Sequence, residues 1–339
     1  MFYRLGRTIL FWLPPETAHR LSLSLMSLII KVPFLRAFTV WFLRPPALET
    51  RSVFGLEFNN PVGIAAGFDK NAEHIDLLAD LGFGFIEIGS VTAEPAGGNA
   101  QPRLFRLPLD DALINRMGLN NHGVSETAKR LTTCARRVPI FVNVAKSPNP
   151  KIEGQFAIAD YLRTIKVVKN ACDVVVINIS CPNSGDGRTF EDPLALKPLL
   201  KAVQQELGDK KRPWLVKISP DLEEGIIRQI IEISVECGVH GFTATNTTLN
   251  RTGLLTTSDT LNEIGAGGLS GAPLHPRALT TVRTIRSMTE LPIIGVGGIR
   301  SAAHAQAFFD AGASLVQLYT GFVYGGPATV KKICAGLKH

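Results

Sequence analysis

Eight short runs rich in β-branched and aromatic residues recur along this chain of 339 residues. The runs are Val62–Ala66, Phe85–Ser90, Ile140–Val144, Val174–Ile179, Trp214–Ile218, Gly241–Thr245, Ile293–Gly297 and Leu315–Leu318. Strands that are apolar on both faces indicate a buried parallel sheet. Eight strand–helix units in succession predict an α/β fold of the (β/α)8, or TIM, barrel type. A doubly wound sheet is the alternative, but it predicts a Gly-x-Gly-x-x-Gly directly after the first strand, which this chain lacks.

The stretches between the runs show helical periodicity, as in Glu73–Leu81, Ile226–Cys237 and Ala302–Ala311. Ahead of the first run, Val53–Phe58 predicts a hairpin that turns at Gly55. Hydrophobic residues make up 45% of the chain and charged residues 19%, which excludes disordered, collagenous and coiled-coil proteins.

Most of the formal net charge of +7 lies in the first 44 residues. This segment holds six bases and one acid, whereas the other 295 residues hold 30 bases and 28 acids. A nucleic-acid footprint is a basic patch on the folded domain itself, so we expect no nucleic-acid partner. The five cysteines are odd in number and include no Cys-x-x-Cys pair, which favours a reducing compartment.

The N-terminal segment combines its positive charge with apolar runs over residues 8–13, 21–30 and 32–43. None reaches the roughly 18 uninterrupted apolar residues of a membrane-spanning helix. We expect two short helices, one of which starts near Ala18 with Glu16 or Thr17 as its cap. Apolar helices edged by bases are typical of an interfacial anchor on an anionic membrane surface. A helical pair packed on the main domain is the alternative.

These features predict three parts of the chain. Residues 1–44 form a helical membrane-docking segment, residues 45–50 a linker, and residues 51–339 the barrel. We expect peripheral attachment at the cytoplasmic face of a membrane.

Polar residues, glycines or lysines follow every one of the eight strands. Because chemistry in a barrel gathers at the carboxyl ends of its strands, this pattern predicts an active site at that end. Two of these strand ends point to phosphate. Gly295–Gly298 precedes a helix that starts near Ser301, and Tyr319–Gly321 follows the next strand. Glycine backbone and a helix N-terminus favour an anion, although an ordinary tight turn would also explain the glycines.

Two reactive side chains stand out against apolar surroundings. Lys217 lies late in the strand WLVKI, where an unpaired ammonium would be costly to bury. It either forms a structural salt bridge or faces an electron-rich flavin ring or a phosphate. Cys181 follows a strand in the run NISCPN, on a loop at the expected site. We expect it to act as a catalytic acid/base, whereas Cys172, Cys237 and Cys334 read as buried, inert thiols.

An amide-rich stretch, Asn115–Asn121, lies between the second and third strands. It is either a plain loop or, with the asparagines and threonine that end other strands, a site for a planar amide-containing ligand. The seven histidines show no metal-binding spacing, so we expect no metal.

Taken together, the motifs AAGFDKN (65–71), GFGFIEIGSVT (82–92), PRLFRLP (102–108), INRMGLNN (114–121), NISCPN (178–183), ATNTT (244–248), GGLSG (267–271), IIGVGGI (293–299) and SLVQLYTG (314–321) resemble those of dihydroorotate dehydrogenases. The resemblance is closest to the membrane-associated, quinone-linked class (class 2), whose N-terminal helices form the quinone entrance. The run Pro15–Arg20 also resembles that class. The resemblance implies a barrel that binds FMN.

The resemblance also assigns residues. Those implied to contact FMN are Ala66, Gly67, Ser90, Asn143, Asn178, Lys217, Thr245, Gly271, Gly298, Tyr319 and Thr320. Those implied to contact substrate are Lys70, Asn115, Arg116, Met117, Gly118, Leu119, Asn178, Asn183, Asn246 and Thr247. His19 and Arg106 match positions that line the quinone passage.

The implied reaction is oxidation of (S)-dihydroorotate to orotate in pyrimidine (UMP) biosynthesis. Cys181 would take the C5 proton while a hydride passes from C6 to FMN, and a membrane quinone would be the final acceptor. One residue departs from the class, because quinone-linked enzymes usually carry Ser where this chain has Cys181. The alternatives are a soluble-type enzyme that uses fumarate or NAD, an RNA-modifying flavin barrel, and a non-catalytic membrane adaptor.

Overall fold

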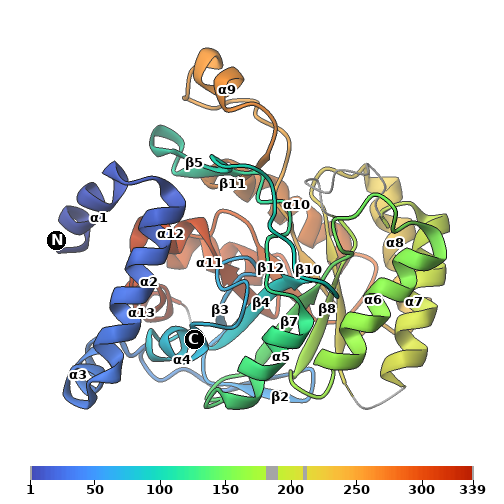
Figure 1. Cartoon of the computed structure of the whole chain (residues 1–339), viewed down its shortest axis with the longest axis horizontal. Helices are drawn as coiled ribbons and strands as arrows, with labels where there is room; N and C mark the ends of the chain where they lie inside the picture. Colours follow the sequence, from blue (N-terminus) through green and yellow to red (C-terminus); the bar gives the residue numbers. More distant parts are fainter. Residues whose placement is uncertain (1, 181–189, 209–211, 338–339) are drawn as a thin grey trace.

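The computed structural model describes residues 2–180, 190–208 and 212–337. Its centre is a closed barrel of eight parallel strands, as predicted (Figure 1). In barrel order the strands are β3 (Val62–Ile64), β4 (Phe85–Val91), β7 (Ile140–Val144), β8 (Val174–Asn178), β9 (Trp214–Ile218), β10 (Gly241–Ala244), β12 (Ile293–Val296) and β13 (Leu315–Leu318). Every residue of β7, β8 and β9 is buried, which explains why these strands read as continuous apolar runs.

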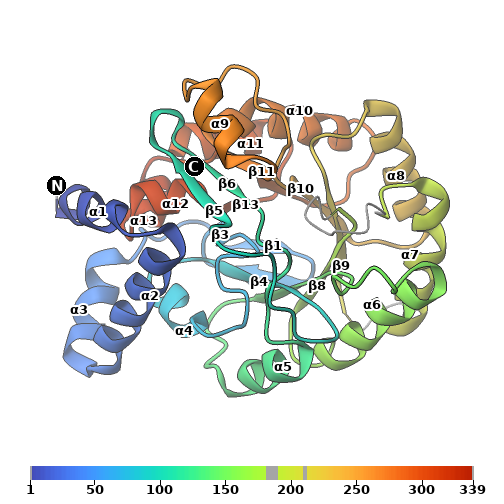
Figure 2. The same cartoon turned by 45° about the horizontal axis from the view of Figure 1, so that its top comes forward.

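Helices surround the barrel (Figure 2). They are α4 (Ile75–Asp80), α5 (Val124–Thr133), α6 (Gly154–Val168), α7 (Pro193–Leu207), α8 (Glu224–Glu236), α10 (His275–Arg286), α11 (Ala302–Asp310), α12 (Thr320–Gly325) and α13 (Thr329–Ala335). The three helices expected from periodicity are α4, α8 and α11, with ends that differ from the expected ones by at most two residues.

An aromatic cluster fills the amino end of the barrel. The predicted hairpin is present as β1 (Arg51–Val53) and β2 (Leu56–Phe58), which pair in antiparallel fashion. Phe58 from this hairpin packs edge-to-face on Phe85 and Phe141, with ring centroids 5.6 and 6.3 Å apart. This closure leaves the carboxyl end as the open end of the barrel.

A small antiparallel sheet extends the carboxyl end. It consists of β5 (Leu104–Leu107), β6 (Ala112–Asn115) and β11 (Gly268–Gly271), in the order β11-β6-β5. The short helix α9 (Ser258–Ile264) projects beyond it at the top of Figure 1. The sequence did not predict this sheet, because its strands are four residues long and β6 pairs with a strand more than 150 positions away.

The N-terminal segment contains three helices rather than the two expected. They are α1 (Phe2–Trp12), α2 (Pro15–Lys31) and α3 (Pro33–Leu43), and they lie together on one side of the barrel (Figure 1, left). Helix α2 starts at Pro15 rather than near Ala18, and neither expected cap is used. Proline suits the first turn of a helix because its missing N–H would have no partner there.

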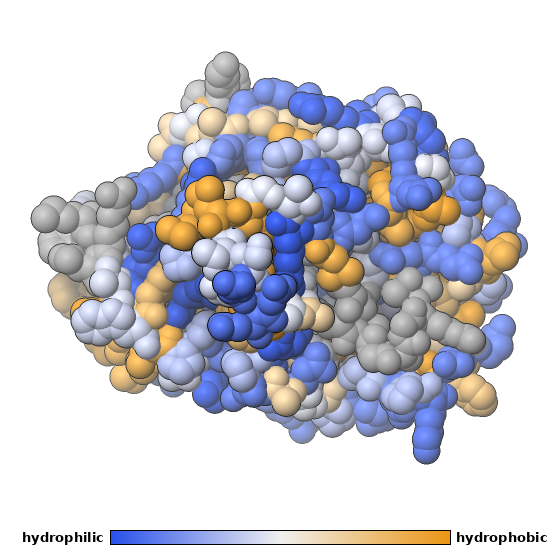
Figure 3. Space-filling model, turned by 90° about the horizontal axis from the view of Figure 1, so that it is seen from above, coloured by the Kyte–Doolittle hydropathy of each residue, from blue (hydrophilic) through white to orange (hydrophobic). Residues whose placement is uncertain are grey.

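Large apolar side chains of these helices are exposed to solvent. They are Ile9, Trp12, Leu21, Leu25, Leu28, Val32, Phe34, Leu35, Phe38, Trp41 and Phe42. Hydrophobic surface is visible on the same side in the space-filling view (Figure 3, left). Among the described residues, no individual helix is long and apolar enough for a membrane span, whereas α2 and α3 together meet the length and composition test with a bend of 113° between them.

Candidate functional site

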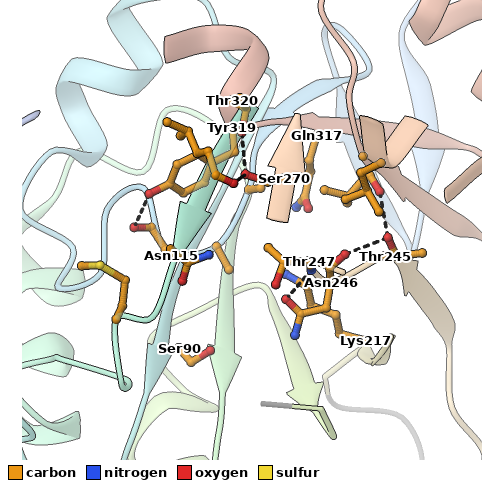
Figure 4. A pocket seen from close by; sticks show the side chains of 18 of the residues that line it. Ser90, Asn115, Lys217, Thr245, Asn246, Thr247, Ser270, Gln317, Tyr319 and Thr320 are labelled. Atoms are coloured by element: carbon orange, nitrogen blue, oxygen red, sulfur yellow. Dashed lines mark hydrogen bonds between the residues drawn. The ribbon is translucent and has the colours of Figure 1, made fainter. Parts of the chain in front are cut away.

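A cavity lies at the carboxyl end of the barrel, between the strand ends and the small sheet (Figure 4). It encloses about 1160 Å³, including its open mouth. Its lining comes from strand ends around the barrel, from Leu104, Leu113, Ser270 and Gly271 of the small sheet, and from the segment after β6. This is the position in which barrel enzymes bind their substrates.

Most of the residues that the resemblance assigns lie together in this cavity. They are Ala66, Gly67, Lys70, Ser90, Asn115, Met117, Gly118, Leu119, Asn178, Lys217, Thr245, Asn246, Thr247, Gly271, Gly298, Tyr319 and Thr320. Asn143 is fully buried behind the lining. Cys181 and Asn183 lie outside the described residues.

A chain of hydrogen bonds runs under the cavity floor. Glu87 is fully buried, and its carboxylate accepts from Asn143 Nδ2 at 2.8 Å and from Gln317 Nε2 at 2.6 Å. Ser90 Oγ donates to Asn143 Oδ1 at 2.5 Å and accepts from Asn178 Nδ2 at 3.2 Å. These five residues come from β13, β4, β7 and β8, so the network joins half of the barrel strands.

The network leaves two acceptors unused. Asn178 Oδ1 and Gln317 Oε1 are buried and have no hydrogen-bond partner among the described residues. Both residues line the cavity, and so does Lys217, a buried cation without an ion-pair or hydrogen-bond partner in the described part of the chain. Buried polar groups are almost always partnered, so unpartnered donors and acceptors around one cavity indicate a polar ligand. A flavin ring, which has both N–H groups and carbonyl oxygens, fits this donor set.

The strand ends after β12 and β13 add backbone donors to the cavity lining. Gly298 has a φ of +65°, and its N–H donates to no acceptor among the described residues. A Cβ at this position would approach the Gly271 carbonyl to 2.7 Å, so only glycine fits. Thr320 and Gly321 open α12, and the first N–H groups of a helix lack intrahelical partners. These groups fit a phosphate, which is the ligand that the sequence predicts here.

Lys70 provides a second, half-buried cation in the cavity. Its Nζ donates to the Gly67 carbonyl at 2.7 Å, and burial lowers the pKa of Lys70 to about 8. The carboxylates of Glu16 and Asp69 oppose this shift, whereas the Arg103 guanidinium adds to it. Lys70 is therefore a cation near neutral pH that an anionic ligand would stabilise.

The chain immediately before Cys181 is held at the cavity. Asn246 Nδ2 donates to Ser180 O at 2.8 Å and lies 3.1 Å from Ser180 Oγ. Its Oδ1 accepts from the Thr247 N–H at 2.8 Å, which fixes the orientation of the amide. Asn246 therefore fixes the position of Ser180, the last described residue before Cys181.

Arg116 does not line the cavity, although its neighbours do. Its guanidinium turns to the α9 segment, where it donates to Ile264 O and Ala266 O, and it lies 4.6 Å from the Phe105 ring centroid. In this geometry the side chain holds the α9 segment to the small sheet. A substrate contact by Arg116 stays a prediction.

His19 and Arg106 connect the N-terminal helices to the barrel. The carbonyl of Phe68 only accepts, so His19 Nε2 donates the 3.0 Å bond between them. Burial lowers the pKa of His19 to about 4, which keeps the ring neutral at pH 7. Arg106 donates to the carbonyls of Phe11 and Leu13 at 3.3 and 2.8 Å. Neither residue lines the main cavity, and their place in a quinone passage stays a prediction.

Sequence reasoning missed Glu87, Gln317 and the ion pair between Glu16 and Arg103. Glu87 and Gln317 are polar residues in the apolar strands FIEIG and LVQLY, which is the signal that singled out Lys217. The Arg103 guanidinium lies 3.1 Å from the Glu16 carboxylate and joins α2 to the segment before β5. Nothing in the local sequence indicates that pairing, since the partners are 87 residues apart.

Comparisons with known proteins agree with this geometry. The sequence profile of the family described as dihydroorotate dehydrogenase matches residues 48–339. Among curated relatives, the dihydroorotate dehydrogenase (quinone) of Nocardia farcinica is 43% identical, over 99% of this chain and 92% of its own length. The enzyme of the same name from Nitrosospira multiformis is also 43% identical, over 98% of this chain and 95% of its own.

Solved structures are similar as well. Crystal structures of DHODH from Eimeria tenella, one ligand-free and one in complex with ferulenol, superpose with a TM-score of 0.78 at 32% sequence identity. Both cover 89% of this chain, and this chain covers 89% or more of each. The profile and the full-length relatives together show that the chain belongs to the dihydroorotate dehydrogenase family.

Proposed function

We propose that this chain is a dihydroorotate dehydrogenase that binds FMN, oxidises (S)-dihydroorotate to orotate and uses a membrane quinone as its final electron acceptor. The observation that supports this most directly is one cavity whose lining combines Lys217 with the acceptors of Asn178 and Gln317, which have no partner among the described residues. The reaction belongs to pyrimidine biosynthesis, as the family name implies.

Different residues of this chain would bind the ring and the phosphate of FMN. Lys217, Asn178 and Gln317 would meet the ring, and the backbone at Gly298 and the start of α12 would hold the phosphate. When bound, the flavin supplies the hydride acceptor, which no side chain provides. Thr245 and Tyr319 complete the lining, and burial raises the pKa of Tyr319 to about 12, so it remains a neutral hydrogen-bond donor.

Polar side chains near Lys70 are placed to bind an anionic amide such as dihydroorotate. Lys70 would pair with the carboxylate, and Asn115 and Asn246 would bond the ring amides. The backbone from Met117 to Leu119 lines the same part of the cavity. Amide contacts and one cation would fix the orientation of a planar ring, which is how the protein would lower the entropic part of the barrier.

Cys181 is the proposed base that removes the C5 proton of dihydroorotate. A thiol with a pKa near 8.5 forms the thiolate much more readily than a serine hydroxyl ionises. Asn246 contributes by holding Ser180, the residue before Cys181, through two contacts to its backbone and hydroxyl oxygens.

The N-terminal helices would dock on an anionic membrane surface. Their exposed Trp, Phe and Leu side chains are apolar, and their excess of bases suits anionic headgroups. Helix α2 also contacts the cavity region through His19 and Glu16, so a lipid-soluble acceptor entering beside α2 would approach the flavin site. This arrangement supports the proposal that His19 and Arg106 line the quinone passage.

A soluble-type acceptor is the second candidate, because Cys181 is the base usual in soluble enzymes. A steady-state assay with ubiquinone, fumarate and NAD in parallel separates the two. We expect turnover with ubiquinone as the acceptor and none with fumarate or NAD. Turnover with fumarate or NAD at comparable kcat/KM would replace the quinone assignment.

A further inference from the structure

Glu87 is a buried carboxylate whose hydrogen-bond partners, within the described part of the chain, include no cation. Its exposed fraction is 0%, and both partners, Asn143 and Gln317, are neutral amides. A buried charge is costly unless every lone pair is used, and an apolar residue at this position would fill the barrel without that cost. Packing alone therefore does not explain why a carboxylate occupies this position.

The chemistry of the carboxylate fixes the direction of every bond in the network. Asn143 Nδ2 and Gln317 Nε2 each donate to one oxygen of Glu87, so both amides turn their NH2 group toward this side chain. Asn143 Oδ1 then points to Ser90, whose hydroxyl proton is used in that bond. Ser90 Oγ can only accept from Asn178 Nδ2, which leaves Asn178 Oδ1 free. The same logic leaves Gln317 Oε1 free at the other end.

We propose that Glu87 is a positioning residue, which sets the amide orientation of Gln317 and, through Asn143 and Ser90, of Asn178, so that both present carbonyl oxygens rather than NH2 groups to the flavin site. The inference rests on the proposed flavin site. Amide groups rotate easily, and the inverted orientation would present NH2 donors instead. Glu87 touches neither the cavity nor the ligand, and acts through residues that do.

Glu87→Gln tests this assignment because its amide can accept only one of the two NH2 groups. Either the Gln317 amide must then invert, or the Asn143 amide must invert together with Ser90 and Asn178 further along the network. Otherwise a buried hydrogen bond is lost. We expect the purified holoenzyme to release FMN at least about tenfold faster, since a buried polar group left unpaired weakens binding to about that extent. We also expect a more positive midpoint potential, because a negative charge near the flavin is lost.

Two further variants separate orientation from fold damage. In E87Q/N143D, the amide introduced at position 87 accepts from Gln317 and donates to the carboxylate introduced at position 143. The second oxygen of that carboxylate accepts from Ser90. Both free acceptors and the net charge are restored, so the FMN release rate and the potential should return close to wild type.

Asp160→Asn is the control, because it neutralises a buried carboxylate of α6 that is bonded to Ser147, away from the cavity. Its FMN release should be unchanged.

Three outcomes would overturn the inference. One is wild-type FMN release and potential in E87Q. Another is failure of E87Q/N143D to recover when both variants melt like wild type. The last is equally fast release in D160N. If E87Q alone fails to fold, restoration of folding and flavin retention by N143D supports the inference, and an equal failure of the double variant contradicts it. Dihydroorotate oxidation by the wild type tests the proposed function separately.

Discussion

Lys70 links pH to substrate binding at the scale of a single residue. Burial lowers its pKa to about 8, so the free protein carries this cation below that pH and a neutral amine above it. An anionic substrate binds the cationic form. We therefore expect KM for dihydroorotate to be flat between about pH 6 and 7.5 and to rise by up to about tenfold per unit above about pH 8. Initial-rate kinetics across this range measure it.

Lys70→Met is the matched variant for that titration. It should raise KM about 10- to 100-fold at pH 7, the contribution of a charge-assisted hydrogen bond, and remove the alkaline rise. A wild-type KM that stays constant to about pH 9.5 would remove Lys70 from substrate binding.

Cys181 gives a second prediction at this scale. Replacing it with Ala should slow flavin reduction by dihydroorotate roughly 10²–10⁴-fold, measured by anaerobic stopped flow. Replacing it with Ser should move the pH–rate curve to higher pH, because a hydroxyl ionises less readily than a thiol. Near-normal reduction in the Ala variant, or the same curve in the Ser variant, would show that Cys181 is not the base.

At the scale of elements, the exposed face of α2 and α3 should decide membrane binding. Substituting Leu25, Leu28 and Trp41 with Ser removes apolar surface without touching the core, since these side chains are 56%, 61% and 72% exposed. We expect loss of co-sedimentation with anionic vesicles and a large fall in quinone turnover. Flavin reduction by dihydroorotate should be retained.

The control for that variant carries the same kind of change on the opposite side of the barrel. Phe156, Leu194 and Val235 are exposed on α6, α7 and α8, which lie far from α2 in Figure 1. Ser at these three positions should leave vesicle binding intact. Equal losses in the two triple variants would contradict the assignment of the membrane face.

The elements also show which parts of the fold the sequence predicts. The eight strands were found because two-sided burial makes them continuous Val- and Ile-rich runs, such as β8 with every residue buried. The sheet β5–β6–β11 was missed because its pairing depends on contacts far apart in sequence. The expectation of two N-terminal helices was wrong, and α2 begins at Pro15 rather than near Ala18 because proline suits the first turn of a helix.

The same physics explains which site residues were predicted. Strand ends converge in a barrel, so Lys217, Asn178 and Thr245 could be placed together from the strand pattern alone. The strand pattern does not determine the direction in which a side chain points. Arg116 therefore turns to Ile264 and Ala266 although its neighbours line the cavity, and the pairing of Glu87 with Gln317 across the barrel appears only in three dimensions.

At the scale of the whole molecule, the proposed reaction connects a region that faces water with a region that faces lipid. The barrel cavity is polar and suits a charged pyrimidine, whereas the N-terminal helices expose apolar surface suited to lipid. The contacts of His19 and Glu16 hold α2 against the cavity region. Electrons taken from a water-soluble substrate would thus leave through a lipid-soluble acceptor within one chain.

The most direct test of this account is the anaerobic addition of dihydroorotate to the purified holoenzyme, followed by ubiquinone, with the flavin absorbance recorded throughout. We expect dihydroorotate to bleach the bound flavin with formation of orotate, and ubiquinone to restore the oxidised spectrum. A flavin that remains oxidised in the presence of dihydroorotate would contradict the central claim.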